Sequence, residues 1–133
     1  MRIKELIFGA GLCLLLFVQV VTAHHSFTAE YDSTKLRQFT GTVTKVEWTN
    51  PHARFYIDVK EERGVTNWNF ELGTPLILRK LGWRADSLKL GDVVTVEGYL
   101  AKDGSKMANA RSVMLSDGRK VFAGSSADTS PTK

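Results

Sequence analysis

The chain has 133 residues, a formal net charge of +4 and 43% hydrophobic residues. A chain of this length can bury one modest core, so we expect a single domain. Basic and acidic residues are intermixed, and no basic run indicates a nucleic-acid-binding surface, so we predict no nucleic-acid partner.

The first 23 residues have the layout of a secretory signal peptide. Arg2 and Lys4 form a short positive region, and an apolar stretch follows over residues 6–21. This stretch is short for a membrane-spanning helix, and it is followed by the small residue Ala23. We therefore predict cleavage after Ala23, a periplasmic or secreted protein, and no stable membrane anchor after cleavage. An uncleaved membrane anchor is the alternative.

The mature chain is predicted to contain no cysteine, because Cys13 lies in the signal peptide. It therefore needs no disulfide and offers no thiolate to a metal or a substrate, even in an oxidising compartment.

Residues 24–35 are predicted to be irregular, with Asp32 and its neighbours as turn residues. A long first strand follows over residues 38–49, and Gly41 inside it indicates a bulge or a bend. Residues 53–59 and 67–72 alternate between apolar and polar side chains, which predicts two half-buried strands.

A short helix is predicted next, with Thr74 as its N-cap, Pro75 at its first position and Gly82 as its stop. Its apolar residues are expected to pack under the sheet. Strands at 92–100 and 107–115 follow, with a hairpin turn between them, and residues 119–122 could add an edge strand. The tail at 123–133 has the composition of a disordered segment.

Three strands, a short helix and two strands are the element order of an OB-like five-stranded Greek-key barrel, which we predict for residues 36–122. The predicted fold class is therefore all-β with one short helix. A small β-sandwich is the alternative, because it explains the alternation but not the position of the helix.

The histidine pair His24–His25 is the first candidate site. After cleavage at Ala23, the α-amine of His24 is free, and its pKa of ~7.7–8.0 leaves part of it deprotonated at neutral pH. Amine and imidazole nitrogens suit Cu(II), and also Zn(II). His52 is the only other histidine and hence the one candidate for a distant third ligand. The alternative is a flexible, solvated terminus without metal.

The segment “EWTNPHARF” is the second candidate site, because it combines an aromatic platform, an amide, a titratable ring and a cation. Its ligand-binding candidates, with the next aromatic residue of the strand, are Trp48, Asn50, His52, Arg54 and Tyr56. The alternative is a core tryptophan followed by ordinary turn residues. Glu71 is expected to be a surface charge that could pair with Arg54.

No catalytic motif is present: the sequence lacks GxSxG, HExxH and a phosphate-binding glycine loop, so we predict a protein that is not an enzyme. The predicted function is that of an exported binding protein with an unknown ligand, with a transition metal as the first hypothesis. The first alternative is a metal-free module that recognises an envelope protein, a peptide, a glycan or another small ligand. The second is a small metalloenzyme that uses the same copper site.

The segments “AHHSF”, “GTVTKVEWTNPHARF”, “LGW”, “LKLGDVVTVEGYLAKDGS” and “LSDGR” carry a family resemblance over residues 22–119. With them, the chain resembles an uncharacterised domain-of-unknown-function family of small secreted proteins from Gram-negative bacteria. The resemblance implies an exported single domain, and it implies no activity, cofactor or catalytic residue.

Overall fold

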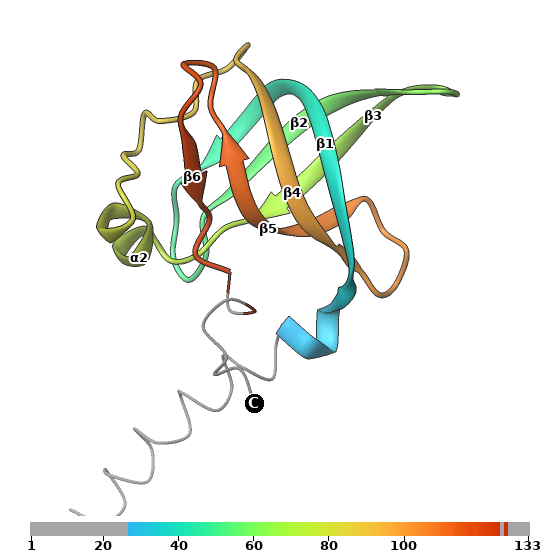
Figure 1. Cartoon of the computed structure of the whole chain (residues 1–133), viewed down its shortest axis with the longest axis horizontal. Coiled ribbons are helices and arrows are strands. Elements are labelled where there is room, and N and C mark those ends of the chain that lie inside the picture. The colour runs from blue at the N-terminus through green and yellow to red at the C-terminus, as the bar shows by residue number, and fades with distance from the viewer. Residues whose placement is uncertain (1–26, 126, 128–133) are drawn as a thin grey trace, which may run out of the picture.

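Six strands and one helix follow a helical turn at residues 27–30 in the computed structural model, which describes residues 27–125 and 127 (Figure 1). The elements are β1 (Tyr31–Glu47), β2 (Arg54–Glu61), β3 (Gly64–Glu71), α2 (Pro75–Lys80), β4 (Val93–Ala101), β5 (Met107–Met114) and β6 (Lys120–Phe122). The prediction of three strands, a short helix and two strands with a short edge strand is confirmed.

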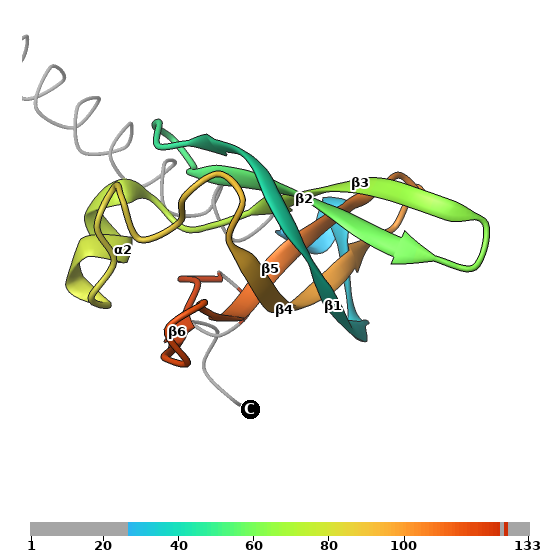
Figure 2. The same ribbon diagram turned by 90° about the horizontal axis from the view of Figure 1, so that it is seen from above.

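All six strands belong to one sheet in the order β3-β2-β1-β4-β5-β6, and neighbours in this order are antiparallel. The sheet also curls back on itself, because Asn69–Glu71 of β3 pair in parallel with Met107–Asn109 of β5. The fold is therefore all-β and OB-like (Figures 1 and 2). The sandwich alternative is not observed in the described residues, since a sandwich needs two packed sheets.

Alternating side chains of the strands form the core, as the sequence pattern predicts. Phe55 and Phe70 are fully buried and stack with ring centroids 5.2 Å apart. Phe39 lies 4.6 Å from Trp68 and 5.1 Å from Phe70, between centroids. Such aromatic pairs supply much of the buried apolar area of a small domain, so this cluster fixes the positions of β1, β2 and β3.

Helix α2 begins as predicted: the hydroxyl of Thr74 accepts a hydrogen bond from the backbone N–H of Ile77. The prediction that its apolar residues all pack under the sheet is wrong, because Leu76 is 61% exposed and only Leu78 among its leucines is buried. Six residues make fewer than two turns, so only one narrow face can contact the sheet.

Strand β1 begins at Tyr31, within the segment 24–35 that was predicted to be irregular. The predicted turn chemistry is present, since the N–H of Thr34 bonds to Asp32 Oδ1 at 3.0 Å. The pairing of β1 with β4 shifts its register between Tyr31 and Leu36, where this turn lies, and strand β1 continues through the shift. Asp32 and Thr34 therefore form a local irregularity inside strand β1 and do not mark the end of the strand.

The bulge predicted at Gly41 lies instead between Val43 and Lys45. Gly41 is regularly paired on both sides, and a Cβ there would lie 2.3 Å from the carbonyl oxygen of Asp58. Glycine is needed because β1 and β2 approach closely at this point.

The start of the predicted disordered tail is packed. Ala123 is fully buried and its carbonyl accepts the N–H of Gly73, while Ser125 is 2% exposed. The composition of this segment indicated disorder, but the burial of Ala123 and Ser125 and the hydrogen bond to Gly73 order its first residues.

Candidate functional site

An ion pair between β2 and β3 forms the centre of the candidate site. Arg54 and Glu71 are direct cross-strand partners, and Arg54 Nη2 lies 2.5 Å from Glu71 Oε2. The two side chains are 27% and 12% exposed. The possible pairing noted in the sequence is therefore present, but Glu71 is a buried carboxylate and not a surface charge.

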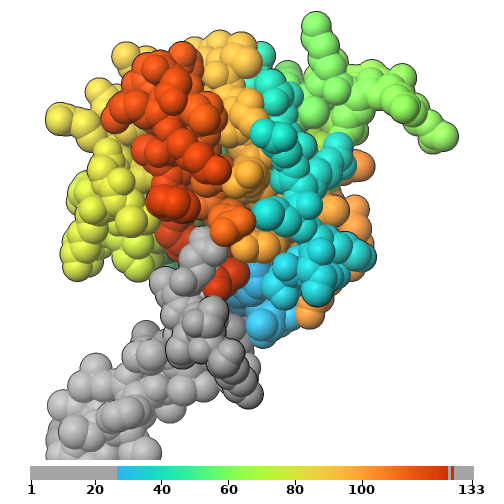
Figure 3. Space-filling view, in the orientation of Figure 1, coloured from blue at the N-terminus to red at the C-terminus, as the bar shows by residue number. Residues whose placement is uncertain are grey.

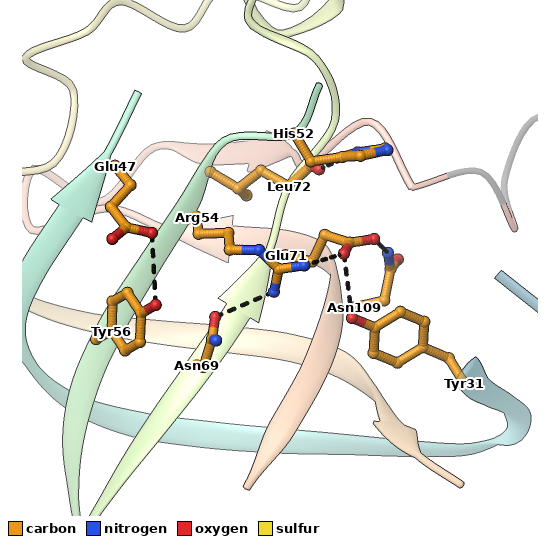
Figure 4. A network of polar contacts seen from close by, with 9 residues as sticks. All are labelled: Tyr31, Glu47, His52, Arg54, Tyr56, Asn69, Glu71, Leu72 and Asn109. Carbon is orange, nitrogen blue, oxygen red and sulfur yellow. Dashed lines mark hydrogen bonds and ion pairs between the residues drawn. The ribbon is translucent and has the colours of Figure 1, made fainter. Parts of the chain in front are cut away.

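Two further side chains donate hydrogen bonds to this carboxylate (Figure 4). The hydroxyl of Tyr31 donates to Oε2 at 3.3 Å, and the amide of Asn109 donates to Oε1 at 3.2 Å. Ser125 donates in turn to the amide oxygen of Asn109 at 2.6 Å. This polar network joins the start of β1, the end of β3, β5 and the C-terminal segment.

Tyr31 shows the electrostatic effect of this environment. Burial of its hydroxyl and the nearby negative charge of Glu71 raise the pKa of Tyr31 well above its ordinary value. Tyr31 therefore remains a neutral hydrogen-bond donor at any physiological pH.

A pocket of about 560 Å³ opens beside the network, between the start of β1, β2 and the β4–β5 hairpin. Its lining includes Tyr31, Arg54, Lys102, Asp103 and Met107. Because the lining carries both charges and apolar surface, it is suited to a ligand that combines polar and apolar groups.

His52 lies at the entry to β2, half-buried, with its ring beside the same network (Figure 4). Its Nδ1 lies 3.0 Å from the carbonyl oxygen of Leu72. A carbonyl oxygen can only accept, so Nδ1 carries the proton and Nε2 of the neutral ring keeps its lone pair. Metal-ligating histidines commonly have this arrangement, in which a backbone carbonyl fixes the tautomer.

The N-terminal end of the described chain is attached near this region. Phe27 is 5% exposed, and its ring centroid lies 5.7 Å from that of Tyr31 and 5.5 Å from that of Tyr99. Tyr31 contacts Glu71, whose neighbour Leu72 contacts His52. Consecutive contacts therefore connect the attachment point of the N-terminal segment with the one histidine that the structure describes.

The predicted metal ligands His24 and His25, and the predicted cleavage residue Ala23, lie outside the described residues. Among residues 27–125 and 127, no three His, Cys, Asp or Glu side chains gather in a way that could hold a metal ion. A site with three such ligands would therefore need at least one residue from outside this part of the chain.

The predicted ligand-binding residues separate into two groups. His52, Arg54 and Tyr56 alternate with the buried residues of the β2 segment, and all three are half-buried. Trp48 packs against the core instead, and Asn50 is exposed in the loop. The Trp48 indole N–H is buried without a hydrogen-bond partner in the described part of the chain. A shared binding surface of all five residues stays a prediction.

Sequence reasoning missed Tyr31, Asn109 and Ser125 as members of the polar network. Asn109 carried a usable signal, because it is a polar residue between two alanines in a strand pattern. Tyr31 and Ser125 carried none, since both lie in segments with the composition of irregular structure.

Solved structures with a similar fold include two crystal forms of Rim1, a mitochondrial single-stranded DNA binding protein from S. cerevisiae. They are 13% and 12% identical to this chain, with TM-scores of 0.47 and 0.48, and the matches cover 61% of this chain and 92% and 91% of theirs. A crystal structure of TiaS in complex with a transfer RNA and ATP also matches, with 17% identity, a TM-score of 0.43 and coverage of 64% of this chain and 19% of that one.

The prediction that nucleic acid is excluded as a partner was wrong, because Rim1 combines a similar fold with single-stranded DNA binding. The low identities and TM-scores give no ligand for this chain either.

No curated protein matches the chain. Within the described residues, no helix has the length and apolar character needed to cross a membrane. The model of one family matches residues 13–110, which is most of the chain. The chain belongs to this family, which is described as a family of unknown function (DUF6152).

Proposed function

We propose that this is an exported binding protein that holds a transition metal, Cu(II) in the first place, between its mature N-terminus and His52. The observation that carries the proposal is the Nδ1–carbonyl contact of His52, because it leaves Nε2 as a free imidazole ligand. The proposed partners of Nε2 are the α-amine and the ring of His24, with His25 as the alternative second imidazole.

The anchored position of Phe27 supports this arrangement. Three residues of chain reach about 10 Å when extended, so a terminus at His24 stays close to its attachment beside Tyr31. The proposal includes export to the periplasm or the medium with cleavage after Ala23, because only cleavage there creates the chelating amine. It also includes a closed five-stranded barrel, which the β3–β5 pairing supports.

Metal titration of the processed protein tests the proposal. N-terminal sequencing first establishes that the exported chain begins at His24. Calorimetric titration with Cu(II) then compares the wild type with His24→Ala and His52→Ala, with Asn50→Ala as a matched control in the same loop. We expect losses of affinity on the order of tenfold to a hundredfold for the histidine variants and none for the control. Equal affinity in all four proteins would refute the metal proposal.

A second candidate is a metal-free interaction module for a glycan, favoured by the polar surface around Tyr56. Tyr56 is the cross-strand partner of Asn69, and Asn67 donates to both Thr44 Oγ1 and Asp58 Oδ1. An aromatic ring among amide and hydroxyl groups can stack on a sugar and bond to its hydroxyls.

A peptidoglycan tetrasaccharide is a suitable probe for the second candidate. Tyr56→Ala should weaken its binding about fivefold, whereas Tyr56→Phe should retain most of it because the ring remains. Equal binding to the wild type and Tyr56→Ala would rule out this surface.

A further inference from the structure

The outer edge of β3, which we define as residues 64–68 on the side away from β2, has no strand neighbour in the described part of the chain. β5 occupies this side only opposite Asn69–Glu71. The β2–β3 hairpin projects beyond the remaining strands, so the edge is accessible on the surface (Figures 1 and 3).

The direction of the backbone groups along this edge follows from the pairing. The N–H of Asn69 points away from β2, because it donates to the carbonyl of Lys106 at 3.0 Å. Groups that point to one side recur at every second residue of an antiparallel strand. The N–H and C=O groups of Val65 and Asn67 therefore point outward and can bond to an added strand.

The edge lacks the features that usually prevent strand addition. Exposed edges in native proteins commonly carry proline, lysine or other charges. No proline and no charged residue occurs from Gly64 to Phe70, and Val65 is 63% exposed. We propose that the outer edge of β3 binds the extended C-terminal segment of a partner protein as an added β-strand.

The position and charge of Lys106 are the reason why the proposed occupant is a chain end. The backbone of Lys106 already occupies the edge opposite Asn69, so an added strand must stop there. Lys106 is exposed, its Nζ lies 5.1 Å from the centroid of the Trp68 ring, and within residues 27–125 it makes no salt bridge. A peptide that runs parallel to β3 places its C-terminal carboxylate next to the ammonium of Lys106, which attracts it. A peptide that runs antiparallel places its N-terminal ammonium there, and the two cations repel each other.

A second copy of the chain fits this edge poorly in the register that pairs Val65 of each copy with Asn67 of the other. Two-fold antiparallel pairing about Thr66 would place Arg63 of the copy opposite Asn69. The backbone of Lys106 already fills that position, and the two cations would repel each other. The edge therefore suits a short, uncharged peptide with one terminal carboxylate better than another copy of β3.

A synthetic peptide tests the proposal, because main-chain bonds dominate this mode of recognition and make it tolerant of sequence. The probe is N-acetylated Thr-Val-Thr-Val-Thr-Val, prepared as the free acid and as the C-terminal amide. The purified protein is compared with Lys106→Gln and with Val65→Pro, which removes one outward N–H. Val65→Ala keeps that N–H and is the matched control.

We expect the free acid to bind about fivefold more tightly than the amide, and this preference to vanish in Lys106→Gln. Val65→Pro should weaken binding about fivefold relative to Val65→Ala. Binding should also slow hydrogen exchange at the amides of Val65 and Asn67. Absence of binding, or equal binding of acid and amide to the wild type, would overturn the proposal. Protection of these amides by concentration-dependent dimerisation would overturn it in favour of a second copy.

Discussion

Arg54 and Glu71 face each other across β2 and β3, with Arg54 Nη2 2.5 Å from Glu71 Oε2. The pair is largely removed from water, and Tyr31 and Asn109 donate further hydrogen bonds to the carboxylate. A buried charge that is paired and fully hydrogen-bonded is tolerated, whereas one without its partner is costly. The network therefore stabilises the region between the N-terminal attachment, the pocket and His52.

Glu71→Gln should lower the free energy of unfolding by about 3 kcal/mol, because it leaves the guanidinium of Arg54 without its counter-charge. Urea denaturation measures the change. Asp58→Asn is the control, since Asp58 lies on the same strand pair and its bond to Asn67 is exposed; it should cost less than about 1 kcal/mol. Equal losses in the two variants would contradict the assigned role of the network.

Tyr31 should not ionise while the protein is folded in moderately alkaline solution. Its pKa is raised by burial and by Glu71, whereas the unfolded chain releases this proton near 10.0. The stability that Tyr31 contributes is therefore complete below pH 10 and falls as the pH rises above it. Ultraviolet difference spectra of the folded wild type and Tyr31→Phe should coincide around pH 10; an additional tyrosinate signal in the wild type would contradict this.

Glu97 should contribute to loss of stability in acid. A hydrogen bond from Ser112 Oγ, 2.8 Å away, lowers the pKa of Glu97 below its ordinary 4.5, and Lys120 adds to the effect. Its contribution is present above pH 4.5 and disappears as the pH falls through the lowered pKa. Glu97→Gln should flatten the decline of the urea midpoint between about pH 5 and pH 3. The exposed Glu62→Gln serves as control, and an identical decline in both variants would refute the assignment.

Gly41→Ala should destabilise the protein by about 1–3 kcal/mol, because the new methyl group meets the backbone of Asp58 and the two strands must separate. Thr42→Ala is the neighbouring control, since Thr42 is exposed and has a side chain already. Thermal unfolding measures both. A melting temperature of Gly41→Ala equal to that of Thr42→Ala would show that the strands are not as close as described.

The sequence predicted the strands well where alternation is strong. Phe55 and Ile57 in β2, and Trp68 and Phe70 in β3, are buried as expected. Strict alternation of apolar and polar residues determines which face of a half-buried strand points to the core. The two ends of the folded region were less predictable. Tyr31 and Ser125 lie in segments rich in turn and polar residues, and only contacts with distant residues order them.

The candidate site was predictable only in part. Arg54 and His52 were identified because their segment combines an aromatic ring, an amide, a titratable ring and a cation. Single hydrogen bonds of the network around Glu71 join residues up to 40 positions apart, and no local pattern specifies such pairings. Trp48 was a candidate both for a binding surface and for the core, and its half-buried ring packs against the core.

The most direct test of the metal proposal is electron paramagnetic resonance of the processed protein loaded with one equivalent of Cu(II). We predict nitrogen hyperfine coupling from an amine and two imidazoles, with one imidazole coupling lost in His52→Ala. A spectrum that is the same in the wild type and His52→Ala, or one that matches Cu(II) in buffer alone, would contradict the proposed site.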